Sequence, residues 1–226
     1  MRKSSTNTLA LKPLGEPVQR SERVYQALLN GIIRGDLDSG AQLYADGIAQ
    51  QLAVSTTPVR EALSRLEKDG LVVKVPYQGW FVRRFQEPEV RDVYEMRAAL
   101  ECFSVRLACD RITPEEIEWL LAHQAAGEAA LARQDMEAYR LYNQELHAAI
   151  MRAAKNSQLA PVIGQISLKT QMLSAKTIRL GRSSRAAQEH RRLIDLIADR
   201  ETAAAQELMQ HHILSALEDI LRHGLG

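Results

Sequence analysis

Residues 46–70 read DGIAQQLAVSTTPVREALSRLEKDG, and this stretch decides the architecture of the N-terminal part of the chain. Apolar residues recur every three or four positions in each half of it, as they do on one face of a helix. These residues are Ile48, Ala49 and Leu52 in the first half and Val59, Ala62, Leu63 and Leu66 in the second. Pro58 is tolerated in a first helical turn, and Gly70 is typical of a helix end. The stretch therefore predicts two short helices joined by a tight turn, a helix-turn-helix.

The sequence on either side extends this unit. An amphipathic helix is predicted before it from the spacing of Val24, Leu28, Leu29, Ile32 and Ile33. Two short β-prone runs, at 71–75 and 80–84, follow it around the turn-forming residues 76–79 (PYQG). They predict a two-stranded hairpin, which is the wing of a winged helix-turn-helix.

The sequence pattern changes after Pro88, where six helices are predicted at about 87–109, 114–133, 135–154, 157–180, 184–199 and 201–223. The start of the second is marked by Thr113, Pro114 and Glu116, which fit a capping box. We therefore expect a mostly α protein with an N-terminal winged helix-turn-helix domain and a C-terminal all-α six-helix bundle. The expected divisions are a flexible arm at 1–16, the winged domain at 17–85 and the helical domain at 86–226.

Charge and composition separate these two parts and exclude several classes of protein. The 226 residues have a net charge of +1, yet residues 1–84 carry 12 Lys and Arg against 8 Asp and Glu, whereas residues 85–226 carry 17 against 20. All six histidines lie in the second part. Two cysteines, Cys102 and Cys109, cannot form a disulfide framework or a zinc ribbon. No apolar run approaches the length of a membrane span, so we expect a cytoplasmic protein without a membrane partner.

The start of the second short helix has the chemistry of a helix that reads DNA. Short hydroxyl side chains contact phosphates or base edges, and arginine reads guanine or binds phosphate. The candidate DNA-binding residues on this helix and on the wing are Ser55, Thr56, Thr57, Arg60, Arg65, Lys74, Tyr77 and Gln78. Taken singly, each could be an ordinary surface residue. Together with the basic excess they favour double-stranded DNA as a partner, with Arg60 as the main contact.

Three histidines of the helical part share one property. The neighbours of His190 and His212 at helical spacing are largely apolar, and His147 shares a helix face with Asn143. All three histidines are expected to face the interior from different helices. Histidines converging in a helical bundle can bind a divalent metal, and Asn143, one turn before His147, could add an amide oxygen. Zinc is the expected metal, with nickel, manganese and iron as alternatives. The other interpretation is that these are hydrogen-bonded core histidines.

The N-terminal residues resemble the GntR family of bacterial transcription regulators over 18–84. The resemblance is carried by 31–35 (GIIRG), Leu43, 48–52 (IAQQL), 54–63 (VSTTPVREAL), Leu66, 69–72 (DGLV) and 79–82 (GWFV). It implies a winged domain that binds operator DNA. Thr56 stands where members usually have arginine.

Residues 88–223 resemble the FCD effector domain of the FadR-type subfamily. The number of predicted helices, six rather than seven, resembles its shorter, VanR-like branch. The matching residues are 93–101 (VYEMRAALE), His147, 153–156 (AAKN), Leu159, 189–190 (EH) and 209–213 (MQHHI). The resemblance implies a divalent metal held by Asn143, His147, His190 and His212, with a small carboxylate effector beside it. It also places Arg97 in the effector pocket. An alternative role for Arg97 is an ion pair with Glu101, four residues later.

These observations predict a homodimeric, ligand-responsive regulator rather than an enzyme. It would repress transcription by binding a palindromic operator and would sense a small organic acid through a metal-containing helical domain. Two alternatives stay open from the sequence. One is a regulator for which the metal ion itself is the signal, and the other is a helical metalloenzyme acting on a bound substrate.

Overall fold

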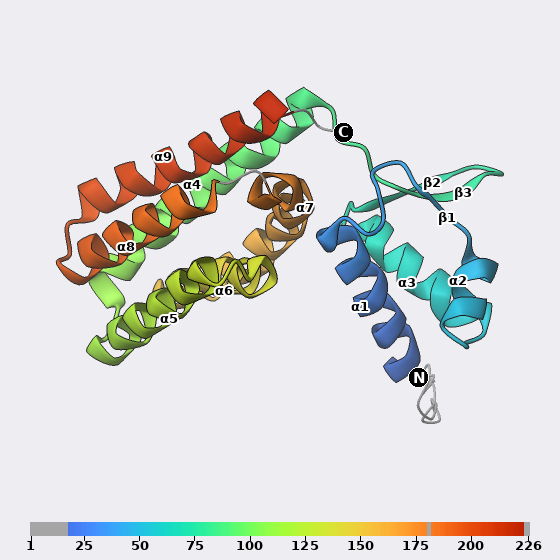
Figure 1. The fold of residues 1–226 in the computed structure, drawn as a ribbon, viewed down its shortest axis with the longest axis horizontal. Helices are drawn as coiled ribbons and strands as arrows, with labels where there is room; N and C mark the ends of the chain where they lie inside the picture. The colour runs from blue at the N-terminus through green and yellow to red at the C-terminus, as the bar shows by residue number, and fades with distance from the viewer. Residues whose placement is uncertain (1–17, 180–181, 224–226) are drawn as a thin grey trace, which may run out of the picture.

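Two groups of elements follow one another along the chain, as Figure 1 shows. The structure is a computed structural model that describes residues 18–179 and 182–223, so the expected arm at 1–16 lies outside the described residues. The N-terminal elements are α1 (Val18–Arg34), β1 (Gln42–Leu43), α2 (Ala45–Gln51), α3 (Thr56–Lys68), β2 (Val72–Val75) and β3 (Gly79–Val82). The C-terminal elements are α4 (Glu87–Arg111), α5 (Pro114–Ala132), α6 (Met136–Ala153), α7 (Leu159–Arg179), α8 (Ser183–Ala198) and α9 (Thr202–His223).

The N-terminal group forms a winged helix-turn-helix, as the sequence predicts. Its sheet has three strands in the order β1-β3-β2, all antiparallel, so the predicted two-stranded hairpin was incomplete. The additional strand β1 pairs Gln42 with Phe81 and Leu43 with Trp80. Two residues are too short to show the alternation by which a strand is recognised in a sequence.

The core of the winged domain is built from the apolar faces that the spacing predicts. Val59, Leu63 and Leu66 of α3 are fully buried and pack with the buried residues of α1. Leu52 is an exception, because its side chain is 40% exposed at the end of α2 instead of facing inward. The tight turn between α2 and α3 is made by Ala53, whose φ is +52°.

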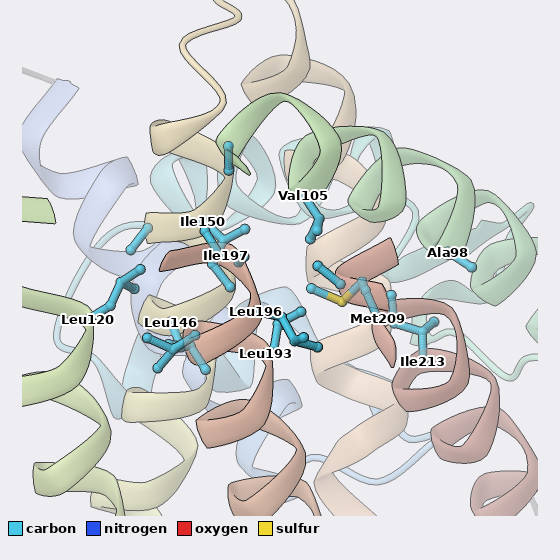
Figure 2. Packing of buried hydrophobic residues seen from close by; sticks show 14 of the residues in the cluster. Ala98, Val105, Leu120, Leu146, Ile150, Leu193, Leu196, Ile197, Met209 and Ile213 are labelled. Atoms are coloured by element: carbon cyan, nitrogen blue, oxygen red, sulfur yellow. The ribbon is translucent and has the colours of Figure 1, made fainter. Parts of the chain in front are cut away.

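The C-terminal group is a bundle whose helices begin and end within about three residues of their predicted limits. The predicted capping box at the start of α5 is present, since the Thr113 hydroxyl accepts from the Glu116 amide and the Glu116 carboxylate accepts from the Thr113 amide. Figure 2 shows the bundle core, in which Leu146 and Ile150 of α6 lie near Leu193 and Ile197 of α8. This core fixes the spacing between the helices that carry the three inward histidines.

The two domains are joined by a short connection and by a packed interface. Only residues 83–86 separate β3 from α4, and within them the Arg83 amide donates to the Leu71 carbonyl. The Arg83 guanidinium then pairs with Glu89 in the first turn of α4, at 2.6 Å. Elsewhere α7 packs against α1 (Figure 1), and Met172 of α7 contacts both hydrophobic cores. The helical domain therefore has direct contact with the winged domain.

No helix in residues 18–179 and 182–223 combines the length and the apolar character that crossing a membrane requires.

Candidate DNA interface and metal centre

The start of α3 presents its polar residues to solvent. Ser55 occupies the position before the helix, and its side chain, like those of Thr57 and Arg60, is exposed. Thr56 is half-buried. The apolar side of α3 is held in the core, so this polar side is available at the surface. The arrangement suits insertion of the helix start into a major groove.

The wing places a second set of candidates at the surface. Tyr77 lies at its tip, fully exposed and with a φ of +63°. Next to it, Gln78 offers its exposed side chain while its backbone carbonyl accepts from Gln42 at 2.6 Å. Lys74 lies over the Trp80 ring, 4.9 Å from its centroid, which holds the lysine on the outer face of the hairpin.

Arg65 has a different environment from the other candidates on α3. Its guanidinium lies 3.8 Å from the centroid of the Tyr25 ring and forms an ion pair with Glu22, so it binds α3 to α1. Arg65 follows Arg60 by five residues, which is about 140° around a helix of 3.6 residues per turn. The structure therefore does not bring Arg65 together with the polar side at the start of α3.

The three inward histidines come together in the bundle. His147 of α6, His190 of α8 and His212 of α9 are buried, and each offers one ring nitrogen within 4.8 Å of the others. The ring centroids of His190 and His212 lie 4.6 Å apart, and that of His147 lies 5.3 and 5.4 Å from them. Sequence positions 147, 190 and 212 therefore form one cluster that could bind a metal.

Carboxylates fix the protonation of two of these rings. The Nδ1 of His147 lies 2.5 Å from Glu101, and the Nδ1 of His212 lies 2.6 Å from Glu189. A carboxylate accepts, so each Nδ1 carries a proton, and in the neutral form of the ring Nε2 keeps its lone pair. This is the arrangement by which a second residue orients a metal-binding histidine.

A longer chain of hydrogen bonds fixes the third ring. The amide nitrogen of Gln124 donates to Glu128 and to the Ala187 carbonyl, which turns its oxygen toward Tyr142. The Tyr142 hydroxyl donates to that oxygen and, 3.1 Å from Nδ1 of His190, is left to accept from it. The Nε2 of His190 therefore also carries a lone pair.

The three lone pairs face one another without a proton between them. Nε2 of His190 lies 3.2 Å from Nε2 of His212, and with both Nδ1 atoms protonated neither can donate to the other. The Nε2 of His147 is buried and has no hydrogen-bond partner among the described residues. Two facing lone pairs and a third buried one are unfavourable unless a cation lies among them. The donor set thus fits a divalent metal, with the three Nε2 atoms as ligands.

Electrostatics keep two of the rings neutral and the nearby carboxylate charged. Burial lowers the pKa of His190 well below its usual value, and it lowers the pKa of His212 to about 4. Burial would raise the pKa of Glu101, but the Arg97 guanidinium at 2.6 Å and the His147 ring hold that pKa well below its usual range. Neutral imidazoles are the form that binds metals.

Arg97 forms the expected alternative ion pair with Glu101 and also lines a cavity beside the histidines. This inner chamber has a volume of about 60 Å³, and Asn143, His147 and His212 are also in its wall. It adjoins a larger outer chamber of about 790 Å³, and the walls of both include Arg97, Asn143, His147 and Ser174. Asn143 and Arg97 are thus both placed next to the histidine cluster.

The inner chamber collects polar atoms that have no partner. The hydroxyls of Tyr94 and Ser183, Nε of Arg182 and Nε2 of His147 are buried and make no hydrogen bond within the described part of the chain. The Arg182 Nε lies 3.3 Å from Asp219, without the alignment of a hydrogen bond. Buried polar groups normally find partners, so this cluster points to a ligand or to ordered water.

Sequence reasoning missed the residues that support the site. Glu101 and His147 are 46 residues apart and Tyr142 and His190 are 48 apart, and no local spacing relates such pairs. Arg182 and Ser183 follow residues that the structure does not describe. Two supporting residues lie beside a predicted ligand in the sequence, Tyr142 before Asn143 and Glu189 before His190.

Family models match both domains. The model described as "Bacterial regulatory proteins, gntR family" matches residues 20–82, and the model of the FCD domain matches residues 92–215. This chain belongs to the GntR family and carries an FCD domain. The family consists of DNA-binding transcription regulators, so this GntR protein is a regulator and not an enzyme.

This regulator is similar in sequence to two curated relatives and in fold to two solved structures. It is 32% identical to the Nta operon transcriptional regulator of Aminobacter aminovorans over 77% of this chain and 81% of the relative. It is 30% identical to the HTH-type transcriptional repressor GlaR of Escherichia coli over 85% and 92%. Its fold is similar to those of E. coli McbR/YncC (TM-score 0.79, 21% identity, 90% of this chain and 98% of that one) and a GntR regulator of Rhodococcus sp. RHA1 (0.75, 22%, 90% and 98%).

Proposed function

We propose that this protein is a homodimeric repressor that releases its operator when a small organic acid binds the helical domain beside a metal. The observation that carries the proposal is the inner chamber, where His147 and His212 of the histidine cluster meet the buried hydroxyls of Tyr94 and Ser183 and the Arg182 guanidinium. The lone pairs suit a cation, and the donors suit the oxygens of an acid. Binding of an acid would shift the placement of the winged domains and change the affinity for DNA.

The metal would be held by Nε2 of His147, His190 and His212, with Asn143 as an oxygen ligand. Zinc suits three imidazoles, and nickel, manganese and iron are the alternatives. When bound, the metal supplies a Lewis-acidic anchor for a carboxylate oxygen. Glu101, Glu189 and the Tyr142–Gln124 pair orient the rings.

The carboxylate of the effector would occupy the inner chamber. The Tyr94 and Ser183 hydroxyls are buried groups that can donate, and a carboxylate is an acceptor with two oxygens. The Arg182 guanidinium, whose Nε lies 3.3 Å from Asp219, brings a cation to the same wall. Arg97 is in the same wall and adds positive charge. The effector would thus be recognised by four residues from α4 and from residues 182–183 at the start of α8.

Operator binding would use the exposed start of α3 and the wing. A two-fold dimer would place two such surfaces about 34–36 Å apart, one turn of DNA. Ser55, Thr56, Thr57 and Arg60 would enter the major groove, while Lys74, Tyr77 and Gln78 would contact the flanking backbone. Arg65 would act indirectly, by holding α3 against α1.

Two further points complete the proposal. GlaR and a relative from Paenarthrobacter nicotinovorans (26% identical over 87% of this chain) are both named as repressors, which supports repression here. The six helices α4–α9 of the described residues suit the VanR-like branch. Operator binding places the protein in the cytoplasm, with the DNA.

A metal analysis of the full chain tests the centre. Elemental analysis of protein purified without a histidine tag should find about one divalent metal per chain, and the double variant His147→Ala with His190→Ala should have lost it. His211→Ala is the control, because His211 is an exposed histidine next to a ligand. Equal metal content in the parent and the double variant would refute the site.

A thermal-shift screen against metals and small carboxylates tests the effector, since a ligand of the folded state raises the melting temperature. We expect a carboxylate that raises the melting temperature to lower the operator affinity also. Operator affinity that follows free metal and ignores every acid would instead favour a metal-sensing regulator.

A further inference from the structure

The tip of the wing holds a tyrosine in a backbone conformation that suits few residues. The Gln78 amide donates to the Val75 carbonyl at 3.1 Å, which closes a turn with Pro76 and Tyr77 at its centre. Tyr77 has a φ of +63° at the position of this turn where glycine or asparagine is usual. A bulky residue in that region is strained, and strain of this kind concentrates at binding sites. Because the Tyr77 ring is fully exposed, packing within the chain does not account for it.

A side chain from outside the hairpin restrains this turn. The hairpin of β2 and β3 projects from the winged domain (Figure 1), and the bonds within a two-stranded hairpin leave its tip weakly held. The Gln42 amide nitrogen donates to the Gln78 carbonyl at 2.6 Å. Gln42 is in β1, before the helix-turn-helix, so this bond joins the turn to a segment 36 residues earlier. The turn is therefore tied to the body of the domain.

The Tyr44 hydroxyl sets the orientation of the Gln42 amide. It donates to Oε1 of Gln42 at 2.5 Å, so the amide nitrogen of Gln42 is directed to the turn. Tyr44 lies directly before α2, and its carbonyl accepts from the Ile48 amide of that helix. The Tyr44 side chain is 64% exposed and adds little to the core. Two hydrogen bonds in series thus connect α2 to the tip of the wing.

We propose that Gln42 and Tyr44 are positioning residues for operator recognition, which fix the tip of the wing before DNA binds. The proposal rests on the proposed operator interface, from which it takes Tyr77 as a DNA contact. It adds two residues that act through Tyr77 rather than by touching the duplex. A loosely held tip would have to be ordered on binding, at a cost in conformational entropy. Holding the tip in advance removes that cost and raises the affinity for the operator.

Nitrogen-15 relaxation of the free, full-length protein tests whether Gln42 holds the tip. Gln42→Met removes both hydrogen bonds with little change of shape. Gln26→Met is the matched control, because the Gln26 amide bonds to Glu22 within the same helix. In Gln42→Met the backbone order parameters of residues 77–79 should fall from about 0.85 toward 0.6, while the control keeps the parent's values. Unchanged order parameters in Gln42→Met would overturn the proposal.

A double-mutant cycle tests whether the held tip serves DNA binding. The probe is a labelled duplex selected from random sequences by the parent protein, titrated by fluorescence anisotropy. Gln42→Met should weaken binding about fivefold, as for the loss of a hydrogen bond. In a Tyr77→Ala background the same change should cost less than about twofold, because a residue that acts through Tyr77 has no effect without it. Tyr44→Phe should show the same dependence with a smaller loss, and it keeps the test valid if Gln42→Met lowers the melting temperature.

The outcomes separate this proposal from the proposed interface. Equal losses for Gln42→Met in both backgrounds would show a direct contact or a general structural effect, and would contradict the positioning role. Weakened binding by Tyr77→Ala together with unaltered binding by Gln42→Met would also contradict it, while leaving the wing as a contact. Tyr77→Ala that binds as tightly as the parent would refute the wing contact itself, and this proposal with it.

Discussion

At the scale of single residues, the candidate metal centre depends on which nitrogen of each histidine ring carries the proton. Glu101, Glu189 and Tyr142 each accept a hydrogen bond from one Nδ1 and so direct an Nε2 lone pair inward. The sequence predicts His147, His190 and His212 as candidate ligands, because helical spacing places each of them on the inward face of its helix. It does not predict Glu101 or Tyr142, because they meet their histidines only when α4, α6 and α8 pack together.

Arg60 is the residue on which we expect operator binding to depend most. Arg60→Ala should weaken binding to an operator chosen by selection from random duplexes by about 1–3 kcal/mol, as for the loss of an arginine–guanine contact. Gel-shift titration measures the effect. Arg23→Ala, an exposed arginine of α1, is the control and should leave the affinity unchanged. Unaltered binding by the Arg60 variant would remove it from the interface.

Tyr94 allows the carboxylate site to be tested without disturbing the fold. Its hydroxyl is buried beside the Arg97 guanidinium, which keeps its ion pair with Glu101 in the variant, so Tyr94→Phe should lower the melting temperature only slightly. Binding of the carboxylates that stabilise the parent protein should fall about tenfold, because one donor to the carboxylate is lost. Tyr77→Phe, on the wing, should change neither property. Full retention of carboxylate affinity in Tyr94→Phe would exclude its hydroxyl from recognition.

At the scale of secondary structure, close packing between α5 and α6 supports the centre. A Cβ added at Gly127 of α5 would lie 2.5 Å from the ring of Tyr142, so only glycine permits this approach. Tyr142 in turn holds His190. A glycine within a predicted helix ordinarily lowers the stability of that helix. The packing role of Gly127 could not be inferred from the sequence, because it depends on which residue of α6 lies against it.

Helix α7 connects the outer chamber with the winged domain. Ser167 and Gln171 of this helix line the outer chamber. Its Leu168 and Met172 pack against the winged core. An effector commonly changes the affinity of such a protein for its second ligand by a factor of about 5–150. Met172→Ala should reduce this factor, so that the effector changes operator affinity little. Effector affinity should change less than about twofold, since Met172 is outside both chamber walls.

Anisotropy titrations of labelled operator with and without the stabilising carboxylate measure this coupling. Val162→Ala, a half-exposed position of α7, is the matched control and should keep the parent's factor. An undiminished factor in the Met172 variant would exclude this contact as the route.

The sequence predicted most elements of the fold but not all of their contacts. The helices have apolar periodicity over two or more turns, and their predicted limits hold within about three residues. The sequence does not predict strand β1, which has two residues, and it does not predict that Arg65 packs on Tyr25. In both cases the deciding partner lies about 40 residues away, beyond any local pattern.

At the scale of the whole molecule, the two domains differ in the sign of their net charge. The DNA-binding half carries the basic excess, and the sensing half is mildly acidic. A net charge of +4 on one winged domain is modest, so two domains per operator would share the contacts with phosphate.

We therefore expect operator affinity to fall steeply with salt, by about 10³–10⁵ between 50 and 200 mM if 6–10 phosphates are contacted. Light scattering should give the mass of two chains in the same buffers. Affinity that is insensitive to salt would contradict the interface, and a monomer at operator-binding concentrations would contradict the dimer.

The four-residue connection between β3 and α4 limits how the winged domain can be rotated relative to the bundle. It is anchored at both ends. At the first residue, the Arg83 amide donates to the Leu71 carbonyl, and at the last residue, Gln86 forms a capping box with Glu89 in which each side chain accepts from the other residue's backbone amide. One residue inserted just inside α4 would turn everything before it by about 100° relative to the bundle. The wing would then face a different side of the duplex. The number of residues at the start of α4 therefore sets the rotation of the winged domain about the axis of this helix.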